Sequence, residues 1–552
     1  MASTPAVGAG VGDIAAQAAR RRTFAIVSHP DAGKTTTTEK LLLYAGALER
    51  AGSVKARSGQ SQTTSDWMDF ERRRGISITA TALQFPHDGL EMTLLDTPGH
   101  HDFSEDTLRV MSAADCAVVL LDASRGIERQ TARLLEVARE RRMPLLVFVN
   151  KCDRPGLEPL GLLDSIEAGV GLPAAPLDWP VGEPGELRGL IERREGAFLR
   201  FERTAHGATA GSEQRLTDVA AEREEGEVYR RAREELELVE AASIGFDLEL
   251  FQAGEQAAVL FGSASWNFGV RMLLEAIAEL TPPPRPLRDA EGVERPLTDP
   301  FAGFAFKVQA NMDPRHRDNL VYLRICSGRF ERGMRVTNAR SGRELALNYP
   351  QQIFGRERST LEQAWPGEVI GVVNAADLRV GDTVYAERPV TFPPAPRLDP
   401  VRFAVARNAR GERHKQFERG LRQLDGEGLI QVLRRDPDHP ESILAGLGEL
   451  QFEAVAERMR AEFGVELRLE PLPFKLARRA ARELATAIRA WPSGEALFRA
   501  DGEMLAAFRD ELDLRRFLER ERGASAERDA LGERLAAIAK DRDPISVSSE
   551  RG

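Results

Sequence analysis

Residues 23–44 read TFAIVSHPDAGKTTTTEKLLLY, which is a short β-branched run, a polar turn and a segment with helical spacing. The turn nearly matches the phosphate-binding pattern G-x-x-x-x-G-K-S/T, with Ser28 in place of the first glycine. Gly33 lets the backbone approach a phosphate, Lys34 can neutralise phosphate oxygens, and the Thr35 hydroxyl can ligate Mg²⁺. Ser28 is tolerable there if its φ is negative. The alternative is a purely structural turn, and the rest of the chain decides between the two.

Three continuous apolar runs follow this loop, namely MTLLD (92–96), CAVVLLD (116–122) and PLLVFVN (144–150). Such runs are typical of strands that are buried on both faces of a parallel sheet. Helical stretches such as QTARLLEVARER (130–141) separate them. The alternation predicts a doubly wound α/β domain with the phosphate-binding loop after its first strand.

The first of these runs leads into DTPGH at residues 96–100. An aspartate at a strand end before a Pro-Gly turn is common in structural loops. In a phosphate site, Asp96 would lie beside Mg²⁺ through a water molecule, and the Gly99 amide would face the terminal phosphate. His100 would orient or polarise the attacking water.

The third run leads into NKCD at residues 150–153. A polar tetrapeptide after a strand is usually only a loop. As a base-recognition motif it is chemically specific, because the Asp153 carboxylate can accept from both N1–H and N2–H₂ of guanine. Asn150 and Lys151 would brace the pocket and cover the base, while Cys152 would be an inward spacer. Adenine offers neither donor pattern, so the motif favours GTP over ATP.

Two weaker signals complete the series. GSA at 262–264 follows an apolar run, and the Ala264 amide could meet guanine O6, although small residues there are usually packing. Ser77 lies in ERRRGISITA (71–80), which is either a solvated charge run or a switch loop whose hydroxyl joins Mg²⁺. The loop lysine, a candidate Mg²⁺ hydroxyl, D-x-x-G, N-K-x-D and S-A follow in order, each at a strand end. Chance matches would not produce this order, and it predicts a GTP site.

At RGIS, DTPGH and NKCD the chain resembles a translational GTPase. The similarity narrows to the bacterial peptide chain release factor 3 family at SHPDAGKTTTTEKLL, SDWMDFERRRGISITATALQF, DTPGHHDFSEDTLR, SWNFGV and FKVQANMDPRHRD. That family carries serine at the positions of Ser28 and Ser77. The likeness extends from about residue 22 to about residue 475 and includes GLGELQFE (446–453). His101 departs from the acidic or amide residue that members often carry, so the register of the resemblance assigns catalysis to His100 and makes His101 a bystander.

The resemblance implies a GTP/GDP site with bound Mg²⁺ and catalysis by His100. The metal ligands would be Thr35, Ser77 and, through water, Asp96. The nucleotide-binding residues would be Ser28, His29, Pro30, Asp31, Ala32, Gly33, Lys34, Thr35, Asp96, Thr97, Pro98, Gly99, His100, Asn150, Lys151, Cys152, Asp153, Ser263 and Ala264.

Composition shifts divide the 552 residues. The fold class that we predict is an α/β P-loop GTPase domain with a helical insertion, followed by a β-barrel domain and an α+β domain. The expected order is a flexible lead (1–21), a GTP-binding domain (22–283) with its insertion at about 157–258, a proline-rich linker (284–300), the barrel (301–392), the α+β domain (401–480) and a helix-prone C-terminal extension with a partly disordered tail (481–552).

The net charge of −10 disfavours non-specific coating of nucleic acid. Local basic runs at 407–424 and 313–318 are either solvated surface or contacts to RNA. Three cysteines and the lack of an apolar run of membrane length predict a cytoplasmic protein without a membrane partner. The resemblance implies that the chain is a monomer that binds the ribosome, both RNA and protein, and class-I peptide chain release factors, but not DNA.

The resemblance therefore implies a ribosome-dependent GTPase of translation termination, which promotes dissociation of class-I factors after peptide release without reading the codon. An elongation-factor-G-like translocating factor would need two further C-terminal domains, and about 150 residues follow position 400. A tRNA carrier like elongation factor Tu would have a second barrel and no long insertion. A GTP-dependent ribosome-binding scaffold with little turnover is an alternative of another class, against which His100 argues.

Overall fold

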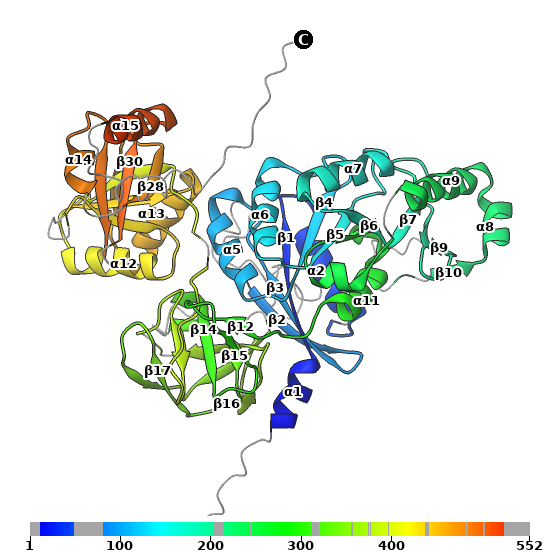
Figure 1. The fold of residues 1–552 in the computed structure, drawn as a ribbon, viewed down its shortest axis with the longest axis horizontal. Coiled ribbons are helices and arrows are strands. Elements are labelled where there is room, and N and C mark those ends of the chain that lie inside the picture. The colour runs from blue at the N-terminus through cyan, green and yellow to red at the C-terminus, as the bar shows by residue number, and fades with distance from the viewer. Residues whose placement is uncertain are drawn as a thin grey trace, which may run out of the picture. The chain divides into compact units, whose positions relative to one another are not determined.

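The structure is a computed structural model that forms two compact units, Met1–Pro396 and Arg397–Gly552 (Figure 1). Ser77, residues 313–318 and the tail from 524 onward lie outside the described residues. The structure describes residues 11–48, 81–202, 211, 213–242, 245–310, 319–354, 357–373, 375, 377–395, 397–436, 441–480, 484–500 and 503–523.

A mostly parallel sheet forms the centre of the first part of unit 1 (Figure 1). Its strands follow the order β6-β11-β5-β4-β1-β3, and β2 pairs antiparallel with β3. β4 and β5 are buried along their whole length, as their apolar sequences predict. The bounds are β1 Arg21–Ser28, β2 Thr81–His87, β3 Leu90–Asp96, β4 Cys116–Asp122, β5 Leu145–Asn150, β6 Ala174–Pro176 and β11 Ala257–Phe261.

Helices cover this sheet in two groups, since α2 contacts α11 whereas α6 contacts both α5 and α7. The predicted α/β domain is thereby confirmed. Because the central strands are parallel, the loops after β1, β3, β5 and β11 all leave the sheet at its carboxyl edge. The helix bounds are α2 Lys34–Tyr44, α5 Ser104–Ser112, α6 Arg129–Glu140, α7 Pro159–Val170 and α11 Val270–Leu280, with α10 Leu248–Gln252 before β11.

The insertion contains strands as well as helices. Its four-stranded antiparallel sheet has the order β10-β9-β8-β7, and α9 packs against β7. The composition predicts a helical insertion instead, because the strongly charged helices dominate it and the strands are only four or five residues long. The bounds are β7 Asp178–Val181, β8 Gly189–Glu192, β9 Ala197–Phe201, β10 Glu213–Leu216, α8 Asp218–Glu225 and α9 Glu227–Ala242.

Antiparallel strands of the second part of unit 1 enclose an apolar core that includes Phe301, Leu323 and Phe330. This confirms the predicted barrel. The predicted linker 284–300 contains a short hairpin of β12 and β13. The bounds are β12 Leu287–Arg288, β13 Glu294–Arg295, β14 Ala302–Ala310, β15 Asn319–Ser327, β16 Phe330–Glu331, β17 Arg335–Asn338, β18 Glu344–Ala346, β19 Pro350–Phe354, β20 Glu357–Thr360, β21 Gln363–Ala364, β22 Val369–Val373 and β23 Thr383–Tyr385.

The barrel contacts the α/β domain along β2, where Phe354 of β19 pairs with Leu83, and near the amino ends of the domain's parallel strands. Arg324 donates to both carboxylate oxygens of Asp115, just before β4, at 2.8 and 2.7 Å. The Thr23 hydroxyl in β1 donates to the Gly367 carbonyl at 2.7 Å. Burial raises the pKa of Asp115 even though Arg324 opposes the shift. The hydrogen bonds of Arg324 and Thr23 therefore lie at the opposite end of the strands from the predicted nucleotide loops.

The lead is not flexible throughout, because helix α1 spans Val11–Ala19 and β1 begins at Arg21. The helix sequence is rich in alanine, which has the highest helix propensity. Ile14 and Ala18 are buried, so packing adds to that propensity. The expected flexible lead of 1–21 is therefore wrong for its second half.

Unit 2 is an α+β unit with a seven-stranded antiparallel sheet in the order β27-β24-β26-β25-β29-β30-β28. Helix α12 packs against α13. The bounds are β24 Arg402–Asn408, α12 His414–Gly426, β25 Gln431–Arg434, β26 Ser442–Gly446, α13 Glu449–Phe463, β27 Leu467–Pro471, β28 Leu476–Ala480, α14 Ala485–Arg489, β29 Glu495–Arg499, β30 Met504–Phe508 and α15 Glu511–Gly523.

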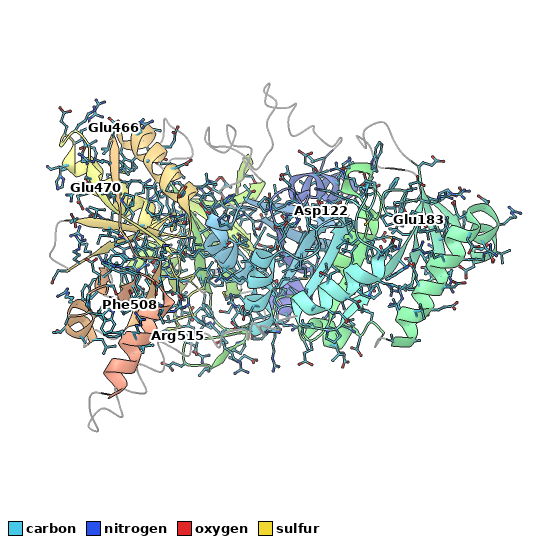
Figure 2. All side chains as sticks on the ribbon, turned by 90° about the horizontal axis from the view of Figure 1, so that it is seen from above. Asp122, Glu183, Glu466, Glu470, Phe508 and Arg515 are labelled. Carbon is cyan, nitrogen blue, oxygen red and sulfur yellow. The ribbon has the colours of Figure 1, made fainter. Side chains whose placement is uncertain are left out.

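The predicted end of this unit, residue 480, is too early. Strands β29 and β30 belong to the same sheet, and all five residues of β30 are buried. Phe508, which Figure 2 labels, is fully buried against Phe517 of α15. The sequence beyond residue 480 is rich in charged residues on average, so its composition does not reveal the short apolar hairpin of β29 and β30. Of the helices in the described ranges, none is long and apolar enough to cross a membrane.

Candidate nucleotide-binding site

The loop between β1 and α2 has the backbone of a tight turn around Gly33. Gly33 has φ of 98° in the left-handed region, and a Cβ there would lie 2.4 Å from Asn150 Nδ2. Both the conformation and the space therefore require glycine. Ser28 is the last residue of β1 and keeps a negative φ, so its position does not need the glycine of the usual pattern.

The predicted phosphate lysine and the predicted metal-site carboxylate lie together. Lys34 Nζ is 2.6 Å from Asp96 Oδ1, and both side chains are buried. Thr97 donates its hydroxyl hydrogen to the backbone of β1 at 2.7 Å, which holds the D-T-P-G loop beside the first loop. Hydroxyl and carboxylate oxygens such as those of Thr35 and Asp96 are the ligands that Mg²⁺ prefers, so the donor set fits that ion.

Asn150 joins the first loop to the last one. Its Nδ2 donates to the Ala32 carbonyl at 2.8 Å, and its Oδ1 accepts from the Ala264 amide at 2.9 Å. The side chain is buried, with 2 % of its surface exposed. The Ala264 amide, which the sequence pattern assigns to guanine O6, is engaged by Asn150 in this structure. That contact to guanine would require Asn150 to share or release the amide.

Lys151 reaches across the first loop, where its ammonium donates to the Asp31 carbonyl and, at 2.7 Å, to Asp122 Oδ2. Burial alone would raise the pKa of Asp122, but hydrogen bonds from Lys151 and Ser124 outweigh it and lower the pKa to about 2. The carboxylate is therefore charged at neutral pH. Asp122, labelled in Figure 2, was not predicted, although it ends an apolar strand as Asp96 does.

Asp153 has two carboxylate oxygens in different surroundings. Oδ2 accepts from the indole Nε1 of Trp266 at 3.2 Å. Oδ1 is buried and has no hydrogen-bond partner in the part of the chain that the structure describes. The Cys152 amide donates to the Gly262 carbonyl at 3.0 Å, and burial raises the pKa of the Cys152 thiol to about 12. These contacts support the spacer role of Cys152, while no motif pointed to Trp266.

His100 lies in a cluster of three consecutive residues. Its Nδ1 accepts from the Asp102 amide at 3.2 Å, and its ring lies 4.4 Å from that of His101, centroid to centroid. His101 Nε2 lies 2.9 Å from Asp102 Oδ1. Burial lowers the pKa of His100, Asp102 opposes the shift and His101 adds to it. His100 is thus neutral near pH 7, and His101 contacts both neighbours although its predicted role is that of a bystander.

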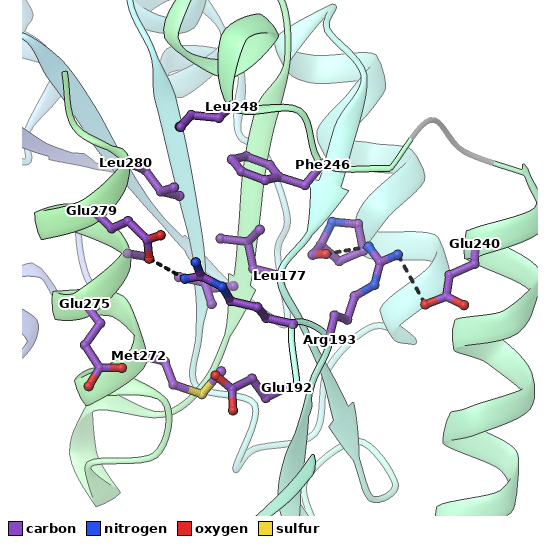
Figure 3. Close-up of a pocket in the computed structure, with 14 residues that line it drawn as sticks. Leu177, Glu192, Arg193, Glu240, Phe246, Leu248, Met272, Glu275, Glu279 and Leu280 are labelled. Carbon is purple, nitrogen blue, oxygen red and sulfur yellow. Dashed lines mark hydrogen bonds and ion pairs between the residues drawn. The ribbon is translucent and has the colours of Figure 1, made fainter. Parts of the chain in front are cut away.

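A separate cavity of about 470 Å³ lies between the insertion and α11 (Figure 3). Leu177, Phe246 and Met272 contribute its apolar walls. At its edge, Arg193 donates to the Pro176 carbonyl at 2.6 Å and to Glu240 at 3.3 Å. No residue of the predicted nucleotide loops lines this cavity, so it is distinct from that site.

Comparisons with protein families match three consecutive parts of the chain. Residues 19–283 match "Elongation factor Tu GTP binding domain", and residues 300–387 match "Elongation factor G domain 2". Residues 392–518 match "Class II release factor RF3, C-terminal domain". The third match extends past residue 480 and agrees with the strands that the structure adds there.

Individual relatives agree with the family matches. The chain is 46% identical to "Peptide chain release factor 3" of Gloeothece citriformis over 463 residues, which is 83% of this chain and 86% of that protein. The same name and identity occur in Synechocystis sp. over 481 residues, 86% of this chain and 88% of that protein. A crystal structure from Thermus thermophilus has a TM-score of 0.66 at 27% identity, covering 84% of this chain and 69% of the other. The chain therefore belongs to the peptide chain release factor 3 family and is a translational GTPase.

Proposed function

We propose that this GTPase of translation termination promotes the dissociation of class-I release factors from the ribosome after peptide release, without reading the stop codon. The main support is one observation: the same chain contains predicted nucleotide loops that contact one another and a C-terminal unit that matches the class II release factor family. GTP-dependent ordering of a switch segment can bias the protein between two states. A few kcal/mol of differential affinity for two ribosome conformations would suffice.

In this proposal the nucleotide lies along the carboxyl edge of the sheet. Lys34 and the amides of the first loop hold the phosphates, at the amino end of α2 where the helix dipole favours negative charge. Asp153 reads guanine N1–H and N2–H₂. Mg²⁺ would be held by Thr35, by Ser77 and, through water, by Asp96, and it would supply charge neutralisation at the phosphates.

His100 is proposed to orient the attacking water. Its Nδ1 accepts the Asp102 amide hydrogen, so a neutral ring carries its own proton on Nε2. The Nε2–H group can donate to the water oxygen, which positions the water without removing its proton. The lowered pKa of His100 supports this role, because burial disfavours the charged ring. The His101 ring lies 4.4 Å from the His100 ring, centroid to centroid, at an interplanar angle of 30°, and would limit its rotation.

The basic run 407–424 contains two different kinds of cation. Arg407 pairs with Glu470 at 2.9 Å and Arg410 pairs with Glu466 at 3.2 Å, and Figure 2 labels both glutamates. Positive charge that is balanced by a neighbouring carboxylate contributes little to attraction for phosphate. These two arginines therefore favour the solvated-surface interpretation for their part of the run.

Helix α12 carries the second kind of cation, which is exposed on the helix surface. Lys415, Arg419 and Arg422 are exposed at spacings of four and three residues, which places them on one helix face. Such a stripe matches the phosphate backbone of ribosomal RNA. Reversing all three to glutamate should weaken ribosome binding and make its salt dependence shallower, with GTP affinity unchanged. Equal ribosome affinity at several salt concentrations would assign the stripe to solvated surface.

Turnover tests whether the chain acts as an enzyme on the ribosome or as a scaffold. GTP hydrolysis is measured with no ribosomes, with vacant ribosomes and with post-release ribosomes that carry a class-I factor. We expect strong stimulation by ribosomes in the wild-type chain and none in Lys34→Ala, which should not hold nucleotide. Equal slow turnover under all three conditions would favour the GTP-dependent scaffold.

A further inference from the structure

The base-recognition loops contain an indole that no nucleotide-binding motif predicts. Trp266 is the last residue of a 3₁₀ helix, η3 (Ala264–Trp266), that follows β11. Its Nε1–H donates to Asp153 Oδ2 at 3.2 Å, while Asp153 Oδ1 is buried without a hydrogen-bond partner among the described residues. Oδ2 is therefore held by a hydrogen bond, and Oδ1 can still accept one from a ligand.

The two loops that carry these side chains are also held to each other by two hydrogen bonds from backbone amides. The Cys152 amide donates to the Gly262 carbonyl at 3.0 Å, and Asn150 accepts from the Ala264 amide at 2.9 Å. The donor and the acceptor therefore stand on a fixed frame. In such a frame one hydrogen bond from the indole suffices to set the rotation of the Asp153 carboxylate.

We propose that Trp266 is a positioning residue for guanine specificity, which fixes the Asp153 carboxylate so that both oxygens meet the base at once. This inference rests on the proposed role of Asp153 in reading guanine. A carboxylate oxygen has two lone-pair sites, so Oδ2 accepts from the indole and from one guanine N–H together. Oδ1 then accepts from the other guanine donor. Without the indole, the carboxylate rotates and loses the paired geometry.

Hypoxanthine isolates the contact, because it keeps N1–H and lacks the 2-amino group of guanine. A freely rotating carboxylate can still place one oxygen on N1–H, which both bases have. A fixed carboxylate gains the second hydrogen bond only with guanine. Trp266 therefore acts on the ratio of GDP to IDP affinity more than on affinity for either base alone.

The test measures GDP and IDP affinity of wild type and Trp266→Phe, which keeps an aromatic ring and removes the N–H donor. We expect GDP affinity to fall about tenfold, as for a lost hydrogen bond to a charged group, and IDP affinity to fall less than about threefold. Trp365→Phe, at a partly buried tryptophan of the barrel, is the matched control and should change neither. Equal losses for GDP and IDP would show a packing role and overturn the inference.

The Asp153→Asn background separates this inference from the proposed function. There, Trp266→Phe should change GDP affinity by less than about threefold, because the two side chains act as a unit. A full tenfold effect of Trp266→Phe in that background would overturn the inference. If Asp153→Asn alone left GDP affinity and the GDP to IDP ratio unchanged, the guanine role of Asp153 itself would fail. If Asp153→Asn weakened GDP binding as expected but Trp266→Phe left the ratio of GDP to IDP affinity unchanged, only the role of Trp266 would be rejected.

Discussion

Replacing Asn150 by alanine should remove two of the hydrogen bonds that connect the phosphate loop with the base-recognition loops. The side chain makes two buried hydrogen bonds, at 2.8 Å to the Ala32 carbonyl and at 2.9 Å from the Ala264 amide. Each backbone group left buried without a partner costs about 1–3 kcal/mol, so Asn150→Ala costs about 2–6 kcal/mol in total. The Ala264 amide can pair with guanine O6 in the nucleotide-bound state, so the loss that acts on nucleotide binding is the one at the Ala32 carbonyl. At about 2 kcal/mol, this loss raises the GDP Kd about 30-fold.

The assay combines an equilibrium titration with a fluorescent guanine nucleotide and urea unfolding of the same preparations. Asn338→Ala is the matched control, because Asn338 is also fully buried and also makes two hydrogen bonds, to Asp382 and from the Arg340 amide. It lies in the barrel. We expect both variants to unfold at lower urea concentration and only Asn150→Ala to bind GDP more weakly.

Two results would refute this reasoning. Wild-type GDP affinity in Asn150→Ala, with a lowered urea midpoint, would make the Asn150 bridge purely structural. Equal losses of GDP affinity in Asn150→Ala and Asn338→Ala would mean that general destabilisation, and not the connection of the loops, controls nucleotide binding.

Three further predictions concern individual side chains. Asp153→Asn should weaken GTP binding by about 2–4 kcal/mol and favour xanthosine triphosphate; equal GTP affinity would remove Asp153 from the pocket. His100→Ala should keep GTP affinity and lower ribosome-stimulated turnover about 100-fold or more, with a smaller effect from His101→Ala; the reverse order would transfer the role to His101. Burial raises the pKa of Asp178 well above its usual value, so the folded chain binds this proton more tightly and loses stability as pH rises above about 4. Asp178→Asn keeps the oxygen that accepts from the Phe261 amide, so its urea midpoint of unfolding should be higher than that of wild type at pH 8 and equal to it at pH 4. A midpoint equal to that of wild type at both pH values would contradict this prediction.

The nucleotide loops were predictable because they stand at strand ends. Buried parallel strands have continuous apolar sequences, and the polar residues that follow them must gather at one edge of the sheet. Lys34 and Asp96 are far apart in the chain, yet the neighbouring parallel strands β1 and β3 bring their loops together, and their side chains lie 2.6 Å apart. The same reasoning places Asn150, at the end of β5, on the edge of the sheet that carries the first loop, whereas its hydrogen bond to the Ala32 carbonyl was not predicted.

Contacts that depend on a single side-chain rotamer were not predictable. Trp266 and Asp153 are 113 positions apart, and no periodicity relates an indole in a 3₁₀ helix to a carboxylate in another loop. The contact of His101 with Asp102 likewise follows from a local 3₁₀ turn, His101–Phe103, and not from the motif.

Short strands inside charged sequence were missed for a different reason. In the insertion and around β29 and β30, the strands are only four or five residues long, and segments rich in arginine and glutamate separate them. The mean hydropathy over a longer window is therefore hydrophilic. Their burial comes from the partner strands of the sheet, as Ala496 opposite Ala506 illustrates. Tertiary pairing therefore supplies information that composition lacks.

The central claim is tested most directly by the dissociation rate of a fluorescent class-I release factor from ribosomes that have already released their peptide. With this chain and GTP, we expect the dissociation rate to rise well above the spontaneous rate. Lys34→Ala, or GDP in place of GTP, should leave it at the spontaneous rate. An unchanged rate with wild type and GTP, together with GTP-dependent movement of tRNA and mRNA on the same ribosomes, would contradict the account and favour translocation.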